Sequence, residues 1–131
     1  MRRSTLLLAL ALLAPLVAPG AAQAAVPTCG GLAATVTGVA DGAVTRFIGT
    51  AGRDVVVGTA GDDYIFTGDF FGADEAGDYV CGLGGKDTIT TLAGPDQVWA
   101  GDGNDDVRAG PGADTVRGGS GSDVIFRRVG R

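Results

Sequence analysis

Residues 82–126 read GLGGKDTIT TLAGPDQVW AGDGNDDVR AGPGADTVR GGSGSDVIF, which is five consecutive blocks of nine residues. Each block has glycine at its fourth place, aspartate at its sixth and valine or isoleucine at its eighth. Two more blocks, GTAGRDVVV and GTAGDDYIF, occupy residues 49–66, and a degenerate block, ADEAGDYVC, follows at 73–81 after an interruption at 67–72. A constant period over this length is typical of a repeat architecture.

The composition of one block predicts its local structure. Its last third is short and rich in β-branched residues, as strands are. Its first two-thirds are rich in glycine, which turns sharply and tolerates positive φ. Two turns and two strands then make a flat coil of eighteen residues. Stacked coils give an all-β fold, a parallel β-roll or right-handed β-solenoid, and glycine recurs too often for helices to persist.

The core and the charges of this roll follow from the same periodicity. One aliphatic side chain per block, at place eight, is expected to point inward, which makes a small core. Stacking also brings the place-six aspartates of successive coils close together, where like charges repel. The bare chain is therefore expected to be marginally stable.

The blocks resemble the RTX, or haemolysin-type, calcium-binding nonapeptide G-G-x-G-x-D-x-U-x. GGSGSDVIF at 118–126 matches every defined place, whereas other blocks carry Thr, Leu or Ala at the first two. The resemblance covers residues 49–126 apart from the insertion 67–72. It implies that calcium ions bind between turns on the same side of the roll.

By that resemblance, alternate aspartates line two edges of the roll and allow at most about six ions. The first edge would carry Asp54, Asp78, Asp96 and Asp114, and the second edge Asp63, Asp87, Asp105 and Asp123. The turns would contribute main-chain carbonyls at Gly52, Gly61, Gly85, Gly103, Gly112 and Gly121. Asp102, at place three, is a further candidate ligand. Ordinary turn-forming aspartates are the alternative at any one position.

Composition excludes several classes of function. The chain has no histidine, so it cannot build a Ser-His-Asp or Cys-His arrangement, and we expect no enzyme. Its formal net charge is −5, which argues against nucleic acid as a partner.

Residues 1–24 are predicted to be a secretory signal peptide. Arg2 and Arg3 precede an apolar run and a small-x-small ending at Ala24. The run is too short for a good membrane span. We therefore expect a secreted protein with an N-terminal β cap at 25–48, repeats at 49–126 and a basic tail at 127–131.

The two cysteines, Cys29 and Cys81, are expected to form a disulfide, because exported chains favour pairing. Two free thiols are the alternative. A bridge would tie the N-terminal cap to the roll.

The leading functional hypothesis is a secreted calcium-ion-binding protein whose roll folds on binding calcium. The alternative is a structural or adhesive surface or matrix protein, in which Phe70 and Phe71 of the insertion form a contact patch. The sequence does not identify a protein or cell-surface partner.

Overall fold

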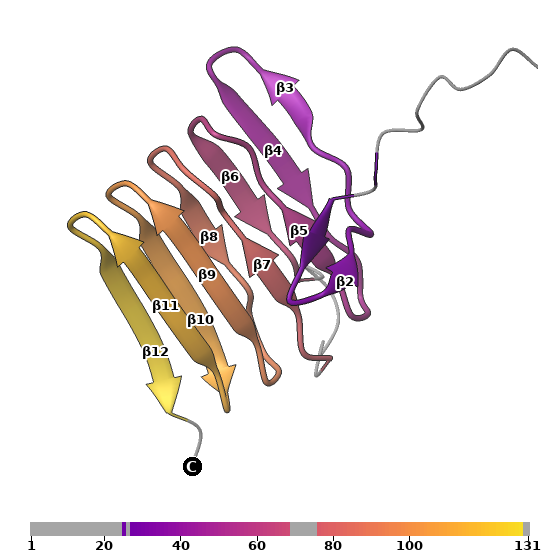
Figure 1. Cartoon of the computed structure of the whole chain (residues 1–131). Coiled ribbons are helices and arrows are strands. Elements are labelled where there is room, and N and C mark those ends of the chain that lie inside the picture. Colours follow the sequence, from indigo (N-terminus) through magenta and orange to yellow (C-terminus); the bar gives the residue numbers. More distant parts are fainter. Residues whose placement is uncertain (1–24, 26, 69–75, 130–131) are drawn as a thin grey trace, which may run out of the picture.

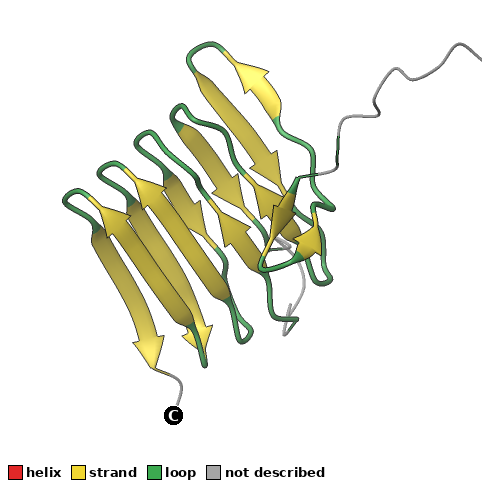
Figure 2. Cartoon of the chain, viewed as in Figure 1, coloured by secondary structure: helices red, strands yellow, loops and turns green. Residues whose placement is uncertain are grey.

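A computed structural model describes residues 25, 27–68 and 76–129, and their regular structure consists of strands alone (Figure 2). The strands are β1 (Thr28–Cys29), β2 (Leu32–Ala33), β3 (Val39–Asp41), β4 (Val44–Ile48), β5 (Val55–Val57), β6 (Asp63–Phe66), β7 (Tyr79–Cys81), β8 (Thr88–Thr90), β9 (Gln97–Asp102), β10 (Asp106–Gly112), β11 (Thr115–Ser120) and β12 (Val124–Val129). The predicted all-β class is confirmed. Within the described part of the chain, no helix is long and apolar enough to cross a membrane.

Two sheets of parallel strands face each other along the roll, and the chain alternates between them (Figure 1). One sheet has the order β12-β10-β8-β6-β4-β3, and the other has the order β11-β9-β7-β5. Every neighbouring pair is parallel except β3 with β4. This is the predicted β-solenoid.

The register gives the size of the coil. Val107 of β10 lies opposite Ile89 of β8 and Ile125 of β12, so partners are one eighteen-residue coil apart. Across the insertion, Ile65 pairs with Ile89 and the offset rises to 24, yet equivalent places still meet. Strands β9 to β12 have six or seven residues, more than the three expected, because the main chain of their glycine-rich turns also pairs.

The place-eight side chains form the core, as predicted. In the six blocks from 49 to 108 these side chains are completely buried: Val56, Ile65, Val80, Ile89, Val98 and Val107. In the last two blocks Val116 is half-buried and Ile125 is exposed. The difference is positional, because β11 and β12 end their sheets and no described strand lies beyond them.

The segment predicted as a cap contributes a strand to the roll itself. β4 pairs in parallel with β6 and places Phe47 opposite Ile65, so Phe47 takes the core place of a block that lacks the aspartate. Before it, Thr35 covers the edge of β5 through hydrogen bonds with Val55. At the other end, Arg127 and Arg128 of the predicted basic tail belong to β12 and pair with Gly110 and Pro111.

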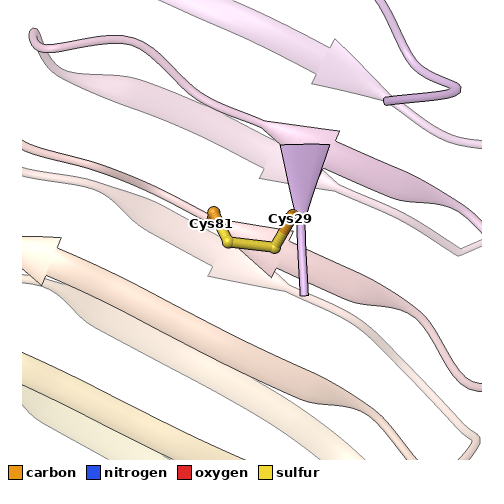
Figure 3. The surroundings of a disulfide bond; sticks show 2 residues. All are labelled: Cys29 and Cys81. Carbon is orange, nitrogen blue, oxygen red and sulfur yellow. A yellow bond between two sulfur atoms is a disulfide. The ribbon is translucent and has the colours of Figure 1, made fainter. Parts of the chain in front are cut away.

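The predicted disulfide joins Cys29 of β1 to Cys81 of β7, with Cα atoms 5.7 Å apart (Figure 3). Cys29 is buried against the roll. The bond fixes the β1–β2 hairpin beside the strands that begin the second sheet. The alternative of two free thiols is thereby excluded in this structure.

Candidate metal centre

Two ladders of aspartates run along the roll, one at each edge. In each rung the main-chain N–H of one place-six aspartate donates to Oδ1 of the aspartate one coil further on. On the first edge the donors and acceptors are Asp54 to Asp78, Asp78 to Asp96 and Asp96 to Asp114, at 2.9 to 3.1 Å. On the second edge they are Asp63 to Asp87, Asp87 to Asp105 and Asp105 to Asp123, at 2.9 to 3.1 Å. The structure thus aligns all eight predicted aspartates in the two expected rows.

Most of these carboxylates are buried. The residues at place six from Asp54 to Asp105 are at most 2% exposed, whereas Asp114 and Asp123, in the last coil, are half-buried. Burial follows from the stacking, because each aspartate lies beneath the turn of the next coil. A buried carboxylate without compensating partners is costly.

Four of the aspartates lack compensation at their second oxygen. The Oδ2 atoms of Asp87, Asp96, Asp105 and Asp114 are buried and accept no hydrogen bond of ordinary geometry from a described residue. Near Asp96, the Thr91 side chain acts to lower the pKa, but its hydroxyl donates to the Ala109 carbonyl. They form two adjacent pairs, one on each edge: Asp87 with Asp105, and Asp96 with Asp114. An anionic oxygen in this position needs a proton or a cation.

The pKa values of these carboxyl groups also indicate that their negative charge lacks compensation. Desolvation raises the pKa of Asp87 to about 7, against the hydrogen bond from the Asp63 main chain, and the charges of Asp63 and Asp105 raise it further. Desolvation likewise raises the pKa of Asp96 to about 7 and increases that of Asp105. Without a cation, Asp87 and Asp96 therefore hold their protons to near-neutral pH.

The place-one glycines allow oxygen atoms to approach the main chain closely. A Cβ at Gly82 would lie 2.3 Å from Asp87 Oδ2 and 2.2 Å from the carbonyl oxygen of Ala100. At Gly58 the equivalent distances are 2.5 Å to Asp63 Oδ2 and 2.5 Å to the Gly82 carbonyl oxygen. A carboxylate and a main-chain carbonyl of the next coil thus converge on one point. Hard oxygen ligands of this kind suit calcium.

The later turns need glycine for their backbone shape. At place four, Gly85, Gly103 and Gly121 have φ of 100°, 143° and 126°. Gly112 lacks positive φ but is held close, since a Cβ there would lie 1.9 Å from the Gly94 carbonyl oxygen. Of the remaining predicted glycines, Gly52 and Gly61 have neither a positive φ nor a close neighbour.

The turns of the first coil, 49–53 and 58–62, treat their aspartates differently. Threonine at place two donates its main-chain N–H to Oδ2, from Thr50 to Asp54 at 2.7 Å and from Thr59 to Asp63 at 2.6 Å. The hydroxyls of these threonines donate to Oδ1 of the same aspartates. Asp54 and Asp63 are therefore satisfied within their own turns, a role that the repeat pattern alone did not predict.

The third block begins earlier than its sequence suggests. The main-chain N–H of Thr67 donates to the Thr90 carbonyl, as that of Thr91, at place one of its block, donates to the Arg108 carbonyl. Thr67 therefore occupies place one, and its buried hydroxyl donates to Oδ2 of Asp78. The additional residues of this block follow Gly68 in the sequence, within the range 69–75 that lies outside the described residues. Thr91, also at place one and buried, was the signal that could have revealed this alignment.

The remaining predicted ligand, Asp102, lies outside the two ladders. Asp102 is exposed, and its Oδ1 accepts a hydrogen bond from the Ser120 hydroxyl at 2.6 Å. The structure therefore does not bring this side chain to the buried, unpartnered Oδ2 atoms. The insertion residues Phe70 and Phe71 lie outside the described residues.

The described residues contain no cluster of three or more Asp, Glu, His or Cys side chains that could hold a metal ion. The candidate ligand set is accordingly a pair of carboxylates from successive coils, completed by main-chain carbonyl oxygens of the turns. This set fits calcium, which takes six to eight oxygen ligands in flexible geometry. Magnesium fits less well, because it requires a small octahedral shell.

Comparison with known proteins identifies the family of the repeats. The family model described as RTX calcium-binding nonapeptide repeat (4 copies) matches residues 44–70, 82–116 and 101–130, which is more than half of the chain. The matched segments lie on either side of the degenerate block, and they include all of β4 and β12. No curated protein and no solved structure matches the chain. The chain belongs to the RTX calcium-binding nonapeptide repeat family.

Proposed function

We propose that the chain is a secreted, non-enzymatic calcium-binding protein, whose later coils gain their stability when calcium binds between successive turns. The observation that carries this proposal is the set of four buried, unpartnered oxygens at Asp87, Asp96, Asp105 and Asp114. Family membership supports calcium as the ion.

On the second edge, Asp87 and Asp105 with the carbonyl oxygen of Ala100 would hold an ion. On the first edge, Asp96 and Asp114 with carbonyls of the turns 91–95 and 109–113 would do so. Calcium supplies the positive charge that these stacked carboxylates lack. The residues of this chain would fix the position of the ion. The hydrogen bonds of the ladders hold the Oδ1 atoms, and the burial of the Oδ2 atoms keeps water away from them.

Binding energy is expected to appear as folding energy, since the ligands come together only in the stacked coils. The single aliphatic residue that each block contributes makes a core too small to offset buried like charges. Secretion is consistent with the leader-like residues 1–24, and extracellular calcium modules have dissociation constants of about 10⁻⁴ to 10⁻³ M.

The test is a calcium titration of the chain after chelator treatment, followed by far-UV circular dichroism and calorimetry, with magnesium in parallel. We expect a cooperative rise of β signal with calcium alone. Asp105→Asn is expected to weaken calcium binding by about tenfold or more, a loss of about 1.4 kcal/mol. Asp41→Asn, which removes the same charge from exposed β3, should leave calcium binding unchanged. The proposal is wrong if the wild type shows no heat of calcium binding. It is also wrong if the Asp105→Asn and Asp41→Asn variants lose calcium affinity equally.

A further inference from the structure

The two ends of the roll differ in how far the core side chains are covered. At the N-terminal end, the core side chains of the first coil are covered: Val56 is 0% exposed and Phe47 is 4% exposed. At the C-terminal end, Ile125 occupies the same core place and is 41% exposed. Its neighbours in β12, Val124 and Phe126, are 50% and 57% exposed. Ile125 is therefore exposed at a place that the coils from 49 to 108 bury completely, and it lies between two further exposed apolar side chains.

The same end also presents unpaired main chain. β11 pairs with β9 and β12 pairs with β10, and no other described strand joins either of them. Both sheets of the roll thus end in open strands of six residues, whereas β3 at the opposite end has only three. Long open strands with exposed apolar residues are a template for pairing with another chain.

We propose that this open end, formed by β11 and β12, is the interface of a closed dimer, in which two copies of the chain stack through their last coils. A second copy offers the matching surface: two open strands at the same spacing, and a half-covered Ile125 to meet its counterpart. The open end cannot stack on the N-terminal end of another copy in the same way. There the segment around Thr35 already occupies the edge of β5, and β3 occupies that of β4. The contact is therefore isologous and closes at two copies rather than growing into a fibre.

Two twofold arrangements of such a dimer are possible, and the charges at β12 favour one of them. Asp123 precedes β12, and Arg127 and Arg128 lie in its second half. A twofold axis perpendicular to the sheets reverses β12, so that Asp123 of one copy approaches the edge of the other copy where Arg127 and Arg128 lie together with Asp114. An axis along the strands would instead bring the two copies of Asp123 together, which like-charge repulsion disfavours. The favoured dimer pairs β12 with β12 and β11 with β11, antiparallel.

The experiment is sedimentation velocity over a range of protein concentrations in excess calcium, with circular dichroism to establish that each variant is folded. The wild type is expected to shift from monomer to dimer as its concentration rises. Ile125→Lys places a charge in the apolar centre and should leave a folded monomer. Val39→Lys makes the same type of change in the exposed strand β3 at the covered end, and should dimerise like the wild type.

A second variant covers the case in which Ile125→Lys fails to fold. Arg127→Glu with Arg128→Glu changes only exposed side chains, and should weaken dimerisation by about tenfold or more. A wild type that remains monomeric at all concentrations would overturn the proposal, as would a dimer that the arginine reversal does not weaken. Species that grow beyond two copies would refute the closed arrangement. Calorimetry with calcium on the same samples reports ion binding independently, so a missing dimer is distinguishable from a missing calcium site.

Discussion

The first coil and the later coils both bury carboxylates at place six, but the oxygens of these carboxylates have different partners. In the first coil, Thr50 and Thr59 at place two satisfy Asp54 and Asp63 through main-chain N–H and hydroxyl groups. In the later turns, place two has positive φ and bears no hydroxyl: Leu83 (77°), Leu92 (62°), Gly101 (116°), Gly110 (68°) and Gly119 (104°). The aspartates that follow four of these turns keep an unpartnered oxygen.

The comparison indicates that the residue and the backbone conformation at place two go together with the contacts of the aspartate. With threonine, the main-chain N–H at place two donates to the carboxylate of the same turn. With leucine or glycine at positive φ, four of the five carboxylates keep the unpartnered oxygen that we propose as an ion ligand. We therefore expect calcium-independent structure around the cap and first coil, and calcium-dependent structure beyond it.

The largest expected effect is that of chelation on local stability. After removal of calcium, amide hydrogens of β8 to β12 should exchange faster by on the order of a hundredfold, while those of β4 and β6 change less, because only the later coils lose a counter-charge. Segment-resolved hydrogen exchange with and without calcium measures this. If hydrogen exchange became equally faster along the whole chain, the expected difference between the first coil and the later coils would be wrong.

The next effect is that of pH on calcium binding. The folded, ion-free pKa of Asp87 and of Asp96 is raised to about 7 from an ordinary value of 3.8. These groups therefore stabilise the ion-free roll below about pH 4, and this stabilisation is lost as the pH rises through 7. Calcium must displace their protons below pH 7, so affinity should fall by roughly tenfold per pH unit per proton between pH 7 and pH 5. Calorimetric titrations at several pH values check this, and a flat profile would contradict it.

A matched pair of glycine substitutions sharpens the difference between turns. Gly103 has φ of 143°, and a Cβ there would lie 1.8 Å from the Gly85 carbonyl oxygen, so Gly103→Ala should cost about 2 to 3 kcal/mol in calcium. Gly52, also at place four, has no atom within 4 Å of a Cβ, and Gly52→Ala should be near neutral. Denaturant unfolding of both variants in excess calcium measures the two free energies. Similar losses would mean that the turns share one conformation.

The smallest effect is expected from the threonine caps. Thr59→Val removes the hydroxyl that donates to Asp63 Oδ1 while keeping the shape of the side chain. It should lower the ion-free stability by about 1 kcal/mol. Calcium affinity of the later coils should not change. Thermal unfolding with and without calcium distinguishes an effect on ion-free stability from an effect on calcium affinity. A loss of stability seen only in the presence of calcium would contradict the assignment of Asp63 to its own turn.

The period of nine was enough to predict the eighteen-residue coil, the two rows of aspartates and the buried place-eight core. It could not predict that Ile125 is exposed, because the pattern treats all blocks alike and no described strand lies beyond the last coil to cover it. Nor could it predict the strand around Phe47, which joins the roll without the aspartate or the glycine of a block. The roles of Thr50, Thr59 and Thr67 depend on hydrogen bonds between places that the repeat pattern leaves free to vary.

The 24-residue coil has a consequence for how such rolls can diversify. Between Gly68 and Ala76 the chain accommodates six more residues than its neighbours, yet Ile65 still meets Ile89 and Val56 still meets Val80. Six additional residues in one block thus leave the pairing of equivalent places on both sheets unchanged. A roll of this kind can therefore vary in length between coils without losing the register of its strands.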